Sequence, residues 1–400
     1  MLLVLWFHTY ERPVPWEYET IAGNLLAGRG YSFAYMGTTY LSFNTPLFGL
    51  LCAVVYYLTN HSFFPILVIQ SLFTLLLATV IFAIGKTIFA EKVGLLAAAV
   101  TAFHPGFVYY DVFNLLPLSI DSFLIALVTF LWLNFRSRIT LKRISLIGAL
   151  IGIAVLSRGI TGMLLPLIAT YFLLFARPLR LVRRLTIVTC LLAACFIVLA
   201  PWLIRNYRIH REFVFIASTS TENFWRGNNP YATGTSTNDR AVKIFRLTPP
   251  EFQAEVFARN EMQQQDFFKS EALRFIRNRP ADAARLYVKK VYYFWWFSPQ
   301  SGIFYAPKYL LIYKTGYAII LGFSIVGVAF GMRSRQPGVR KSCLILLSVM
   351  ISICLGQSAF YVEGRHRWLI EPILLIFFSF GVIRLWTSRL LKKSSSKAAS

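Results

Sequence analysis

The chain has 400 residues, of which 56% are hydrophobic, 16% aromatic and only 14% charged. Soluble proteins carry about 25% charged residues, and several apolar runs here reach the roughly 20 residues that cross a bilayer, so the composition excludes a soluble globular protein. A net charge of +24 would suggest a nucleic-acid partner if the protein were soluble. Here Lys and Arg cluster in short segments between apolar runs, as in membrane proteins. We therefore expect membrane lipids, and no nucleic acid, as partners.

The first part of the chain is mostly polar. Residues 1–7 are too few to span a bilayer, and a polar loop follows at residues 8–45. Apolar residues at helical spacing predict a short interfacial helix over residues 16–27, which Gly28 would end. The next apolar run, residues 46–58, is also too short for a comfortable crossing.

Nine longer apolar runs follow, and we expect each to span the membrane. They lie at residues 63–86, 93–110, 118–135, 144–157, 160–176, 185–203, 309–331, 343–360 and 368–384. The predicted fold class is therefore an all-α polytopic membrane protein, a transmembrane helix bundle with a small extracytoplasmic cap. We divide the chain into an N-terminal bundle with the first outer loop at 8–62 (1–203), the cap (204–308), C-terminal transmembrane helices (309–386) and a disordered cytoplasmic tail (387–400).

Basic residues in the joints between these runs predict the orientation of the chain. Four groups are present: Arg136, Arg138, Lys142 and Arg143; Arg177, Arg180, Arg183 and Arg184; Arg333, Arg335, Arg340 and Lys341; and Arg389, Lys392, Lys393 and Lys397. All four fall on one side if residues 46–58 lie along the membrane surface, whereas a crossing there would separate the first two groups from the last two. The positive-inside rule favours the surface helix, which places residues 8–62 and 204–308 outside the cytoplasm.

The acidic residues support the same layout. The chain has 17 Asp and Glu, and nine of them lie in residues 204–308. Only Glu91 of the other eight maps to the cytoplasmic side. The remaining seven map to the outer face or just inside it: Glu11, Glu17, Glu19, Asp111, Asp121, Glu363 and Glu371. Acidic groups near membrane depth are costly and usually functional, so we expect the chemistry at the outer face.

Three of these carboxylates are candidate catalytic residues. Glu17 begins the predicted interfacial helix, where the positive helix end favours a carboxylate, and it is the first candidate for a general base; the alternative is that Glu17 and Glu19 only cap and solvate that helix. Asp121 and Asp111 bracket the next outward turn. Asp121 either caps its span or faces Glu17, to orient a base, bind an acceptor or hold a divalent ion.

Several arginines on the same face are candidates for binding phosphate. Arg158 interrupts an apolar stretch, and its guanidinium needs an anionic partner, either a phosphodiester or a protein carboxylate. Arg365 and Arg367, with His366 between them, form a second cationic group whose alternative partners are Glu363 and Glu371. Arg205 lies where a span leaves the bilayer, and an interfacial anchor is the simpler role for it. Together, a base and cations at a membrane face suit transfer of a sugar from a lipid phosphate.

Six stretches occur in an order and spacing that resemble one family over nearly the whole chain. They are WEYETIAGNLLAGRGYSF at 16–33, Pro46, PWLIRNYR at 201–208, FWRGNNPYATG at 224–234, FIRNRP at 275–280 and EGRHRWLIEP at 363–372. They resemble the bacterial members of the protein O-mannosyltransferase and aminoarabinose transferase superfamily, the GT-C glycosyltransferases. The resemblance implies a GT-C fold, an outer-face active site and a polyprenyl-phosphate-linked sugar as donor. It also implies that the first outer loop supplies a catalytic acid, here Glu17, and that a second acid before a span fits Asp121 better than Asp111.

We therefore expect a hexosyl- or pentosyltransferase in the bacterial inner membrane, with its active site facing the periplasm or exterior and a lipid, glycan or protein as acceptor. The first alternative is a transporter or flippase of lipid-linked sugars; transporters often show internal repeats and broken midplane helices, and the sequence shows no repeat. The second alternative is an inactive scaffold subunit. No metal site or cofactor is predicted, although a divalent ion at the carboxylates is left open.

Overall fold

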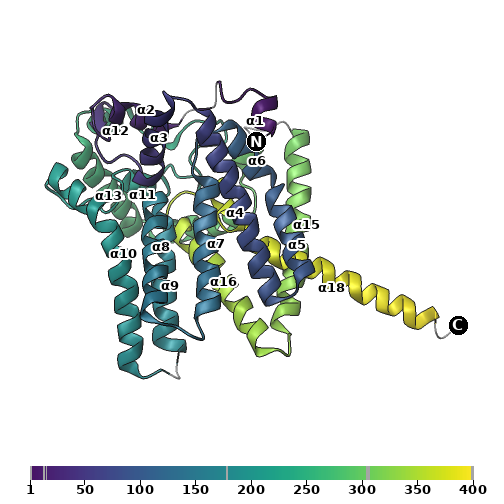
Figure 1. Ribbon diagram of the computed structural model, residues 1–400. Coiled ribbons are helices and arrows are strands. Elements are labelled where there is room, and N and C mark those ends of the chain that lie inside the picture. Colours follow the sequence, from purple (N-terminus) through teal and green to yellow (C-terminus); the bar gives the residue numbers. More distant parts are fainter. Residues whose placement is uncertain (1, 12–13, 15, 177–178, 303–306, 398–400) are drawn as a thin grey trace.

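The computed structural model describes residues 2–397, apart from 12–13, 15, 177–178 and 303–306. Every apolar run that we expected to span the membrane carries helix, and these helices, apart from the projecting last one, stand side by side in an upright bundle (Figure 1). They are α4 (Phe64–Ile88), α5 (Glu91–Ala102), α6 (Pro105–Phe113), α7 (Leu118–Phe135), α8 (Leu141–Ser157), α9 (Leu164–Thr170), α10 (Leu181–His210), α15 (Pro307–Met332), α16 (Pro337–Ser358) and α18 (Glu371–Lys397).

Within the described part of the chain, five helices are long and apolar enough to cross a membrane, namely α4, α7, α10, α15 and α16. The bent pair α5 and α6 makes a sixth. Helix α8 has 17 residues, and α9 lies between a 3₁₀ turn (Gly159–Met163) and a π-helical turn (Tyr171–Phe175). The chain is a multi-pass membrane protein, as its composition predicts.

The run expected to be a single span at residues 93–110 is bent by 40° where α5 meets α6. Pro105, the first residue of α6, has no N–H to continue the helix of α5. His104 caps α6, because its Nδ1 accepts a hydrogen bond of 3.1 Å from the backbone N–H of Gly106. The bend leaves Nε2 of His104 facing helix α18, 3.2 Å from Oε1 of Glu371.

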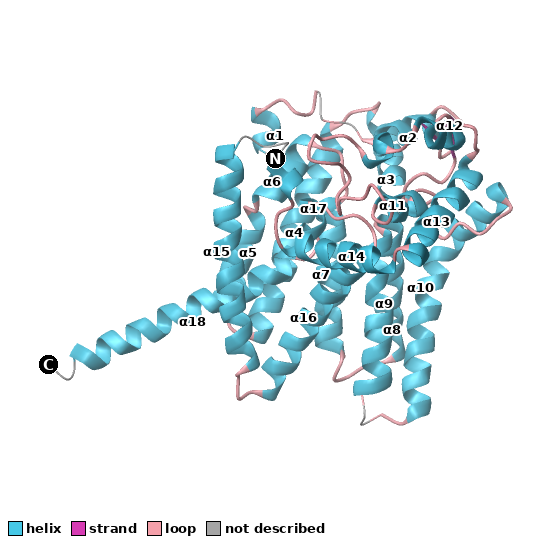
Figure 2. Cartoon of the chain, turned by 180° about the vertical axis from the view of Figure 1, so that it is seen from behind, coloured by secondary structure: helices cyan, strands magenta, loops and turns pink. Residues whose placement is uncertain are grey.

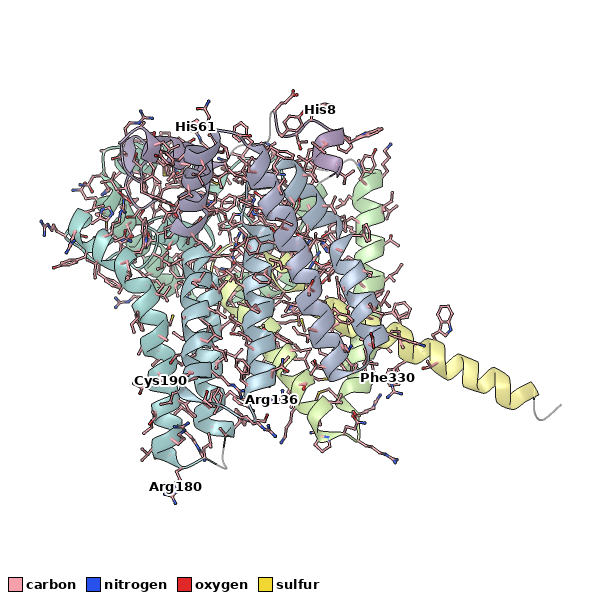
Figure 3. All side chains as sticks on the ribbon, in the orientation of Figure 1. His8, His61, Arg136, Arg180, Cys190 and Phe330 are labelled. Atoms are coloured by element: carbon pink, nitrogen blue, oxygen red, sulfur yellow. The ribbon has the colours of Figure 1, made fainter. Side chains whose placement is uncertain are left out.

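The two ends of the bundle differ in character (Figure 3). His8 and His61 lie at one end, together with the first loop and the helices that follow α10; we call this the cap end. Arg136, Arg180 and Phe330 lie at the opposite end, which we call the basic end. Helix α3 (Pro46–Thr59) lies within the cap end, and the chain continues from it into α4 at that same end. It does not cross the bundle, and the basic joints therefore gather on one side.

We expect the basic end to face the cytoplasm and the cap end to face outside. In a protein without its five native cysteines, Asp239→Cys in the cap and Arg335→Cys in the joint before α16 place single thiols at exposed positions. An impermeant maleimide applied to intact cells should label Asp239→Cys and leave Arg335→Cys unlabelled until the membrane is opened. Labelling of both thiols from one side would contradict this topology.

The first loop contains a helix and a small hairpin. Helix α1 (Leu2–Trp6) precedes it, and α2 (Glu17–Leu26) occupies the position predicted for the interfacial helix. Gly28 follows with φ of 74°, a left-handed conformation that glycine adopts without strain. Strands β1 (Phe33–Tyr35) and β2 (Thr38–Tyr40) then pair antiparallel. The all-α prediction did not include this hairpin.

The segment after α10 is mainly helical and covers the cap end. It contains α11 (Ser220–Arg226), a 3₁₀ turn (Ile244–Leu247), α12 (Pro250–Phe257), α13 (Glu261–Asn278), α14 (Pro280–Trp295) and a second 3₁₀ turn (Pro299–Gly302). Trp225, Phe245 and Phe268 form the centre of its own small core. Figure 2 shows α14 lying across the bundle, with α11 and α13 beside it.

The first loop and this segment are bound to each other. The Glu261 carboxylate accepts hydrogen bonds from the backbone N–H groups of Leu41 (2.6 Å) and Ser42 (3.0 Å). Tyr40 donates to Gln264, whose amide donates to the Met36 carbonyl at 2.9 Å. These bonds hold the end of the first loop against α13 and fix the position of α2 over the bundle.

Two further helices complete the chain. The short α17 (Gly364–Trp368) connects α16 to α18. Helices α15 and α18 cross closely at Gly327 and Gly381, because a Cβ on either glycine would meet a backbone carbonyl of the other helix. Helix α18 then extends away from the bundle (Figure 1) and continues as far as Lys397, through most of the tail that we expected to be disordered.

Candidate active site

One charged pair joins the first turn of α7 to the end of α8. Asp121 lies in the first turn of α7 and is fully buried, and Nε of Arg158 lies 2.5 Å from its Oδ2. Ser157 donates to the other carboxylate oxygen at 2.5 Å. The Arg158 side chain remains 25% exposed, and neither of its Nη atoms bonds to another described residue. A protein carboxylate is thus one partner of Arg158, and the outer edge of the guanidinium remains available to an anion.

A second pair comes from α17 and the residue before it. Nη2 of Arg365 lies 3.0 Å from Oε2 of Glu363, and its guanidinium lies over the ring of Trp16 at 5.2 Å. Ser236 donates a hydrogen bond to Glu363. Burial is the largest influence on the Glu363 carboxyl and acts to raise its pKa, but the adjacent Arg365 charge, the Ser236 hydrogen bond and the Arg226 charge act together to lower the pKa below its usual value. Arg365 and Arg158 are near enough for their positive charges to interact.

The residues that follow Arg365 do not extend this cationic group. Burial, and then the nearby Arg365 charge, lower the pKa of His366 to about 3, so its ring is neutral at physiological pH. Its Nδ1 accepts a hydrogen bond of 3.1 Å from the backbone N–H of Glu363. Consecutive residues on α17 point in different directions, and the Arg158 charge acts on both Arg365 and His366, of which only Arg365 is a cation at this pH.

Arg367 is buried in the bundle instead. It is 1% exposed, with Nε 3.0 Å from Oε2 of Glu371 and the guanidinium 3.6 Å from the centre of the Tyr317 ring. Nε2 of His104, at the bend between α5 and α6, lies 3.2 Å from the other oxygen of Glu371. Because the Arg367 guanidinium already contacts Glu371 and Tyr317, we assign Arg367 to the packing of α18 rather than to phosphate binding.

A third pair lies on α11 and was not among our candidates. Arg226 and Glu222 form an ion pair one helical turn apart, and Glu222 is almost fully buried. Tyr35 of β1 donates to Glu222 at 3.2 Å, and the Arg226 guanidinium lies 5.0 Å from the centre of the Tyr361 ring. The i, i+4 spacing of Glu222 and Arg226 was the one sequence signal that could have found them.

Glu17 belongs to the first turn of α2, whose neighbouring side chains reach these pairs. Its own side chain is half-buried and makes no hydrogen bond or ion pair with another described residue. Trp16, just before it, lies under Arg365. The Tyr18 hydroxyl lies 3.4 Å from Oγ1 of Thr45, which donates to the Ser157 carbonyl at 2.7 Å. The first turn of α2 therefore lies between the Arg365 pair and the Arg158 pair, with an unpaired carboxylate.

Glu19 is directed elsewhere. Its charge interacts with Cys52 and Tyr56 on α3, whereas the charge of Glu17 interacts with Tyr35 of the hairpin. Residues two apart on a helix point about 200° apart, so the two carboxylates of α2 face different surroundings.

The other two candidates lie away from this group. Asp111, on α6, is 3% exposed and accepts a hydrogen bond of 2.5 Å from Thr74. Arg205 donates from Nη1 to Ser42 at 2.8 Å and lies over the Trp202 ring at 4.6 Å, so it anchors the first loop to α10. Within the described residues, no three or more His, Cys, Asp or Glu side chains are grouped as a metal site would need.

A buried lysine holds together the two segments that carry these pairs. Nζ of Lys290, on α14, donates to the Gly227 carbonyl (2.9 Å), Oδ1 of Asn228 (3.2 Å) and the Ala359 carbonyl (3.5 Å). Burial lowers the pKa of Lys290 to about 7. A Cβ on Gly227 would meet the Phe360 backbone, so glycine permits this close approach. The end of α11 and the start of the Glu363 segment are thereby fixed side by side.

The comparisons with known proteins agree with this fold. The family model described as dolichyl-phosphate-mannose-protein mannosyltransferase matches residues 44–204, from the start of α3 through most of α10. The fold is similar to that of ArnT from Cupriavidus metallidurans bound to undecaprenyl phosphate, with a TM-score of 0.57 over 99% of this chain and 14% sequence identity. The chain therefore has a GT-C-type fold, a transmembrane helix bundle.

The chain is also similar in fold to the oligosaccharyltransferase AglB from Archaeoglobus fulgidus, in complex with an inhibitory peptide and a dolichol-phosphate. The TM-score is 0.52 over 96% of this chain, at 13% identity. The chain spans 62% of the length of the ArnT chain and 47% of the AglB chain. No curated protein sequence matches this chain significantly.

Proposed function

We propose that this protein is a GT-C glycosyltransferase that moves a sugar from a polyprenyl-phosphate donor to a lipid, glycan or protein acceptor. The observation that carries the proposal is the group at the cap end. The partly exposed guanidinium groups of Arg158 and Arg365 lie near the first turn of α2, where Trp16 contacts Arg365, the charge of Arg158 acts on Tyr18, and Glu17 has no bonded partner among the described residues. A base and phosphate-binding cations are the two requirements of this transfer.

The phosphate of the donor binds to Arg158, with Arg365 contributing a second positive charge. Arg158 has both Nη atoms unbonded to described residues, and Asp121 fixes the guanidinium through Nε. This fixed fork suits two oxygens of one phosphate. The similar structures of ArnT and AglB hold undecaprenyl phosphate and dolichol-phosphate, which supports a polyprenyl-phosphate donor here. Asp121 thus acts through Arg158, as a positioning residue.

Glu17 activates the acceptor. Its side chain is half-buried and forms no ion pair with a described residue, and it belongs to the same loop that bonds to Glu261 of α13 through Leu41 and Ser42. We propose that the cap end faces the periplasm or exterior of a bacterial inner membrane, so that the acceptor reaches Glu17 from that side. The same three side chains, Glu17, Arg158 and Arg365, would serve for a hexose or for a pentose.

Arg158→Ala should weaken binding of undecaprenyl phosphate about ten- to a hundred-fold, because a charge-assisted hydrogen bond of this kind contributes about 1.5–3 kcal/mol. Arg158→Lys should recover only part of the affinity, since it keeps the charge and loses the fork. Binding of the lipid to the purified protein in nanodiscs measures both changes, and circular dichroism confirms that each variant is folded.

Arg205→Gln is the matched control, because Arg205 lies at the same end and is already bonded to Ser42 and Asn206. We expect it to leave lipid affinity within about two-fold of the unchanged protein, the range of a mutation outside the site. A folded Arg158→Ala protein with full affinity would assign Arg158 to structure alone.

A further inference from the structure

A cavity of about 310 Å³ lies at the basic end, opposite the candidate active site. It is enclosed by the ends of α4 and α7 and by the start of α16. Apolar side chains such as Ile84 and Leu133 form part of its wall, and Asn134, Arg136 and Ser342 form a polar part. Figure 3 shows Arg136 at this end of the bundle, far from His61 and the cap.

Arg136 is the charged group of this cavity, and it is incompletely bonded. Its Nη2 donates to Oγ of Ser342 at 3.0 Å. Its Nη1 is buried and has no hydrogen-bond partner among the residues that the structure describes. Among the described residues, no carboxylate forms an ion pair with Arg136, and Glu91 at this end pairs with Lys86 instead. Leaving a buried charged donor unpaired is costly, so the geometry calls for an anion.

The start of α16 adds one further backbone donor to the same cavity, because the N–H groups of Val339 and Arg340 already bond to the Gln336 carbonyl. Gly338 and Val339, in the first turn of α16, line it together with Gln336, the residue before the helix. Pro337 has no N–H, and the N–H of Gly338 makes no hydrogen bond with another described residue. The first turn of a helix carries partial positive charge and binds anions.

We infer that this cavity is a phosphate-binding site, in which the Arg136 guanidinium and the N–H of Gly338, in the first turn of α16, hold one phosphate group. The guanidinium supplies directional donors and the Gly338 N–H supplies one more. The apolar part of the wall is suited to the start of a hydrocarbon chain, so the phosphate of a phospholipid headgroup and a free phosphate ion are the two sources of this chemistry. The site lies at the other end of the bundle from Glu17 and Arg158 and does not depend on the function proposed for them.

The test uses the purified full-length protein in detergent, with thermal unfolding as the readout, because a ligand that binds only the folded state raises the unfolding temperature. Three additions are compared: phosphatidylglycerol, a diacylglycerol without phosphate, and sodium phosphate. We expect phosphatidylglycerol to stabilise the protein, diacylglycerol to have no such effect, and Arg136→Gln to weaken the apparent affinity for phosphatidylglycerol about ten-fold or more.

Arg340→Gln is the matched control, since it removes the same charge from an exposed position near the start of α16, outside the cavity wall. It should bind phosphatidylglycerol like the unchanged protein. If Arg136→Gln does not fold, Ser342→Ala takes its place, because it removes the partner that holds Nη2 and should weaken binding several-fold.

Stabilisation by sodium phosphate that is lost in Arg136→Gln supports the site with a free ion as its ligand, and stabilisation by phosphatidylglycerol alone supports it with a lipid headgroup. Equal stabilisation of the unchanged protein, Arg136→Gln and Ser342→Ala by every addition would overturn the inference. So would a response to diacylglycerol as large as that to phosphatidylglycerol.

Discussion

Glu371→Gln should lower the free energy of unfolding by about 3–5 kcal/mol, the usual cost of removing one partner of a buried ion pair. Arg367 and Glu371 are each only 1% exposed, and the carboxylate also meets His104 at the bend between α5 and α6. Without the charge of Glu371, the buried guanidinium of Arg367 has no anionic partner among the described residues, and its contacts with the Tyr313 hydroxyl and the aromatic rings around it remain. Unfolding in mixed micelles with a rising fraction of dodecyl sulfate, followed by circular dichroism, measures the change.

The chain offers a matched exposed pair as the control. Glu255 and Arg259 have the same i, i+4 relation on the cap, at 2.6 Å, but their side chains are 52% and 27% exposed. Glu255→Gln should cost less than about 1 kcal/mol, because solvent screens an exposed pair. Equal losses in the two variants would show that the buried pair does not anchor α18 to the bundle.

The spans were predictable from the sequence because a bilayer imposes a fixed length on each apolar run. Each of the nine runs carries helix. The bend at His104 was missed, since hydropathy averages over the run and takes no account of the missing N–H of Pro105. The hairpin at residues 33–40 was missed for a related reason: its strands have three residues each and no long alternating pattern.

The charged residues were found as candidates, but their partners were not. Asp121 and Arg158 belong to neighbouring helices and are 37 positions apart, so no sequence spacing connects them. Their alternatives were therefore left open, and the structure supplies the Asp121 partner. Arg365 and Arg367 look equivalent in sequence, but α17 turns one toward Arg158 and the other into the bundle. A short helix between two spans decides which arginine can meet a ligand.

Glu17→Gln should lower the rate of sugar transfer about 10²- to 10⁴-fold, the usual contribution of a general base, while binding of undecaprenyl phosphate stays near that of the unchanged protein. The amide keeps the size and hydrogen-bonding capacity of the carboxylate, and Glu17 has no partner among the described residues that the change would break. Folding should therefore survive. Transfer from a polyprenyl-phosphate sugar by the protein in liposomes, measured beside lipid binding, separates the loss of turnover from a loss of donor affinity.

Glu19→Gln is the control within the same helix, because Glu19 is also half-buried but directed toward Cys52 and Tyr56 on α3. It should change the transfer rate by less than about three-fold, since a group outside the site makes no contact in the transition state. A dispensable Glu17 with an essential Glu19 would place the acceptor on the α3 side of α2. If neither variant slows transfer, the base lies outside α2. Glu222 is then the next carboxylate to replace, because Tyr35 bonds to Glu222 and also interacts with the charge of Glu17.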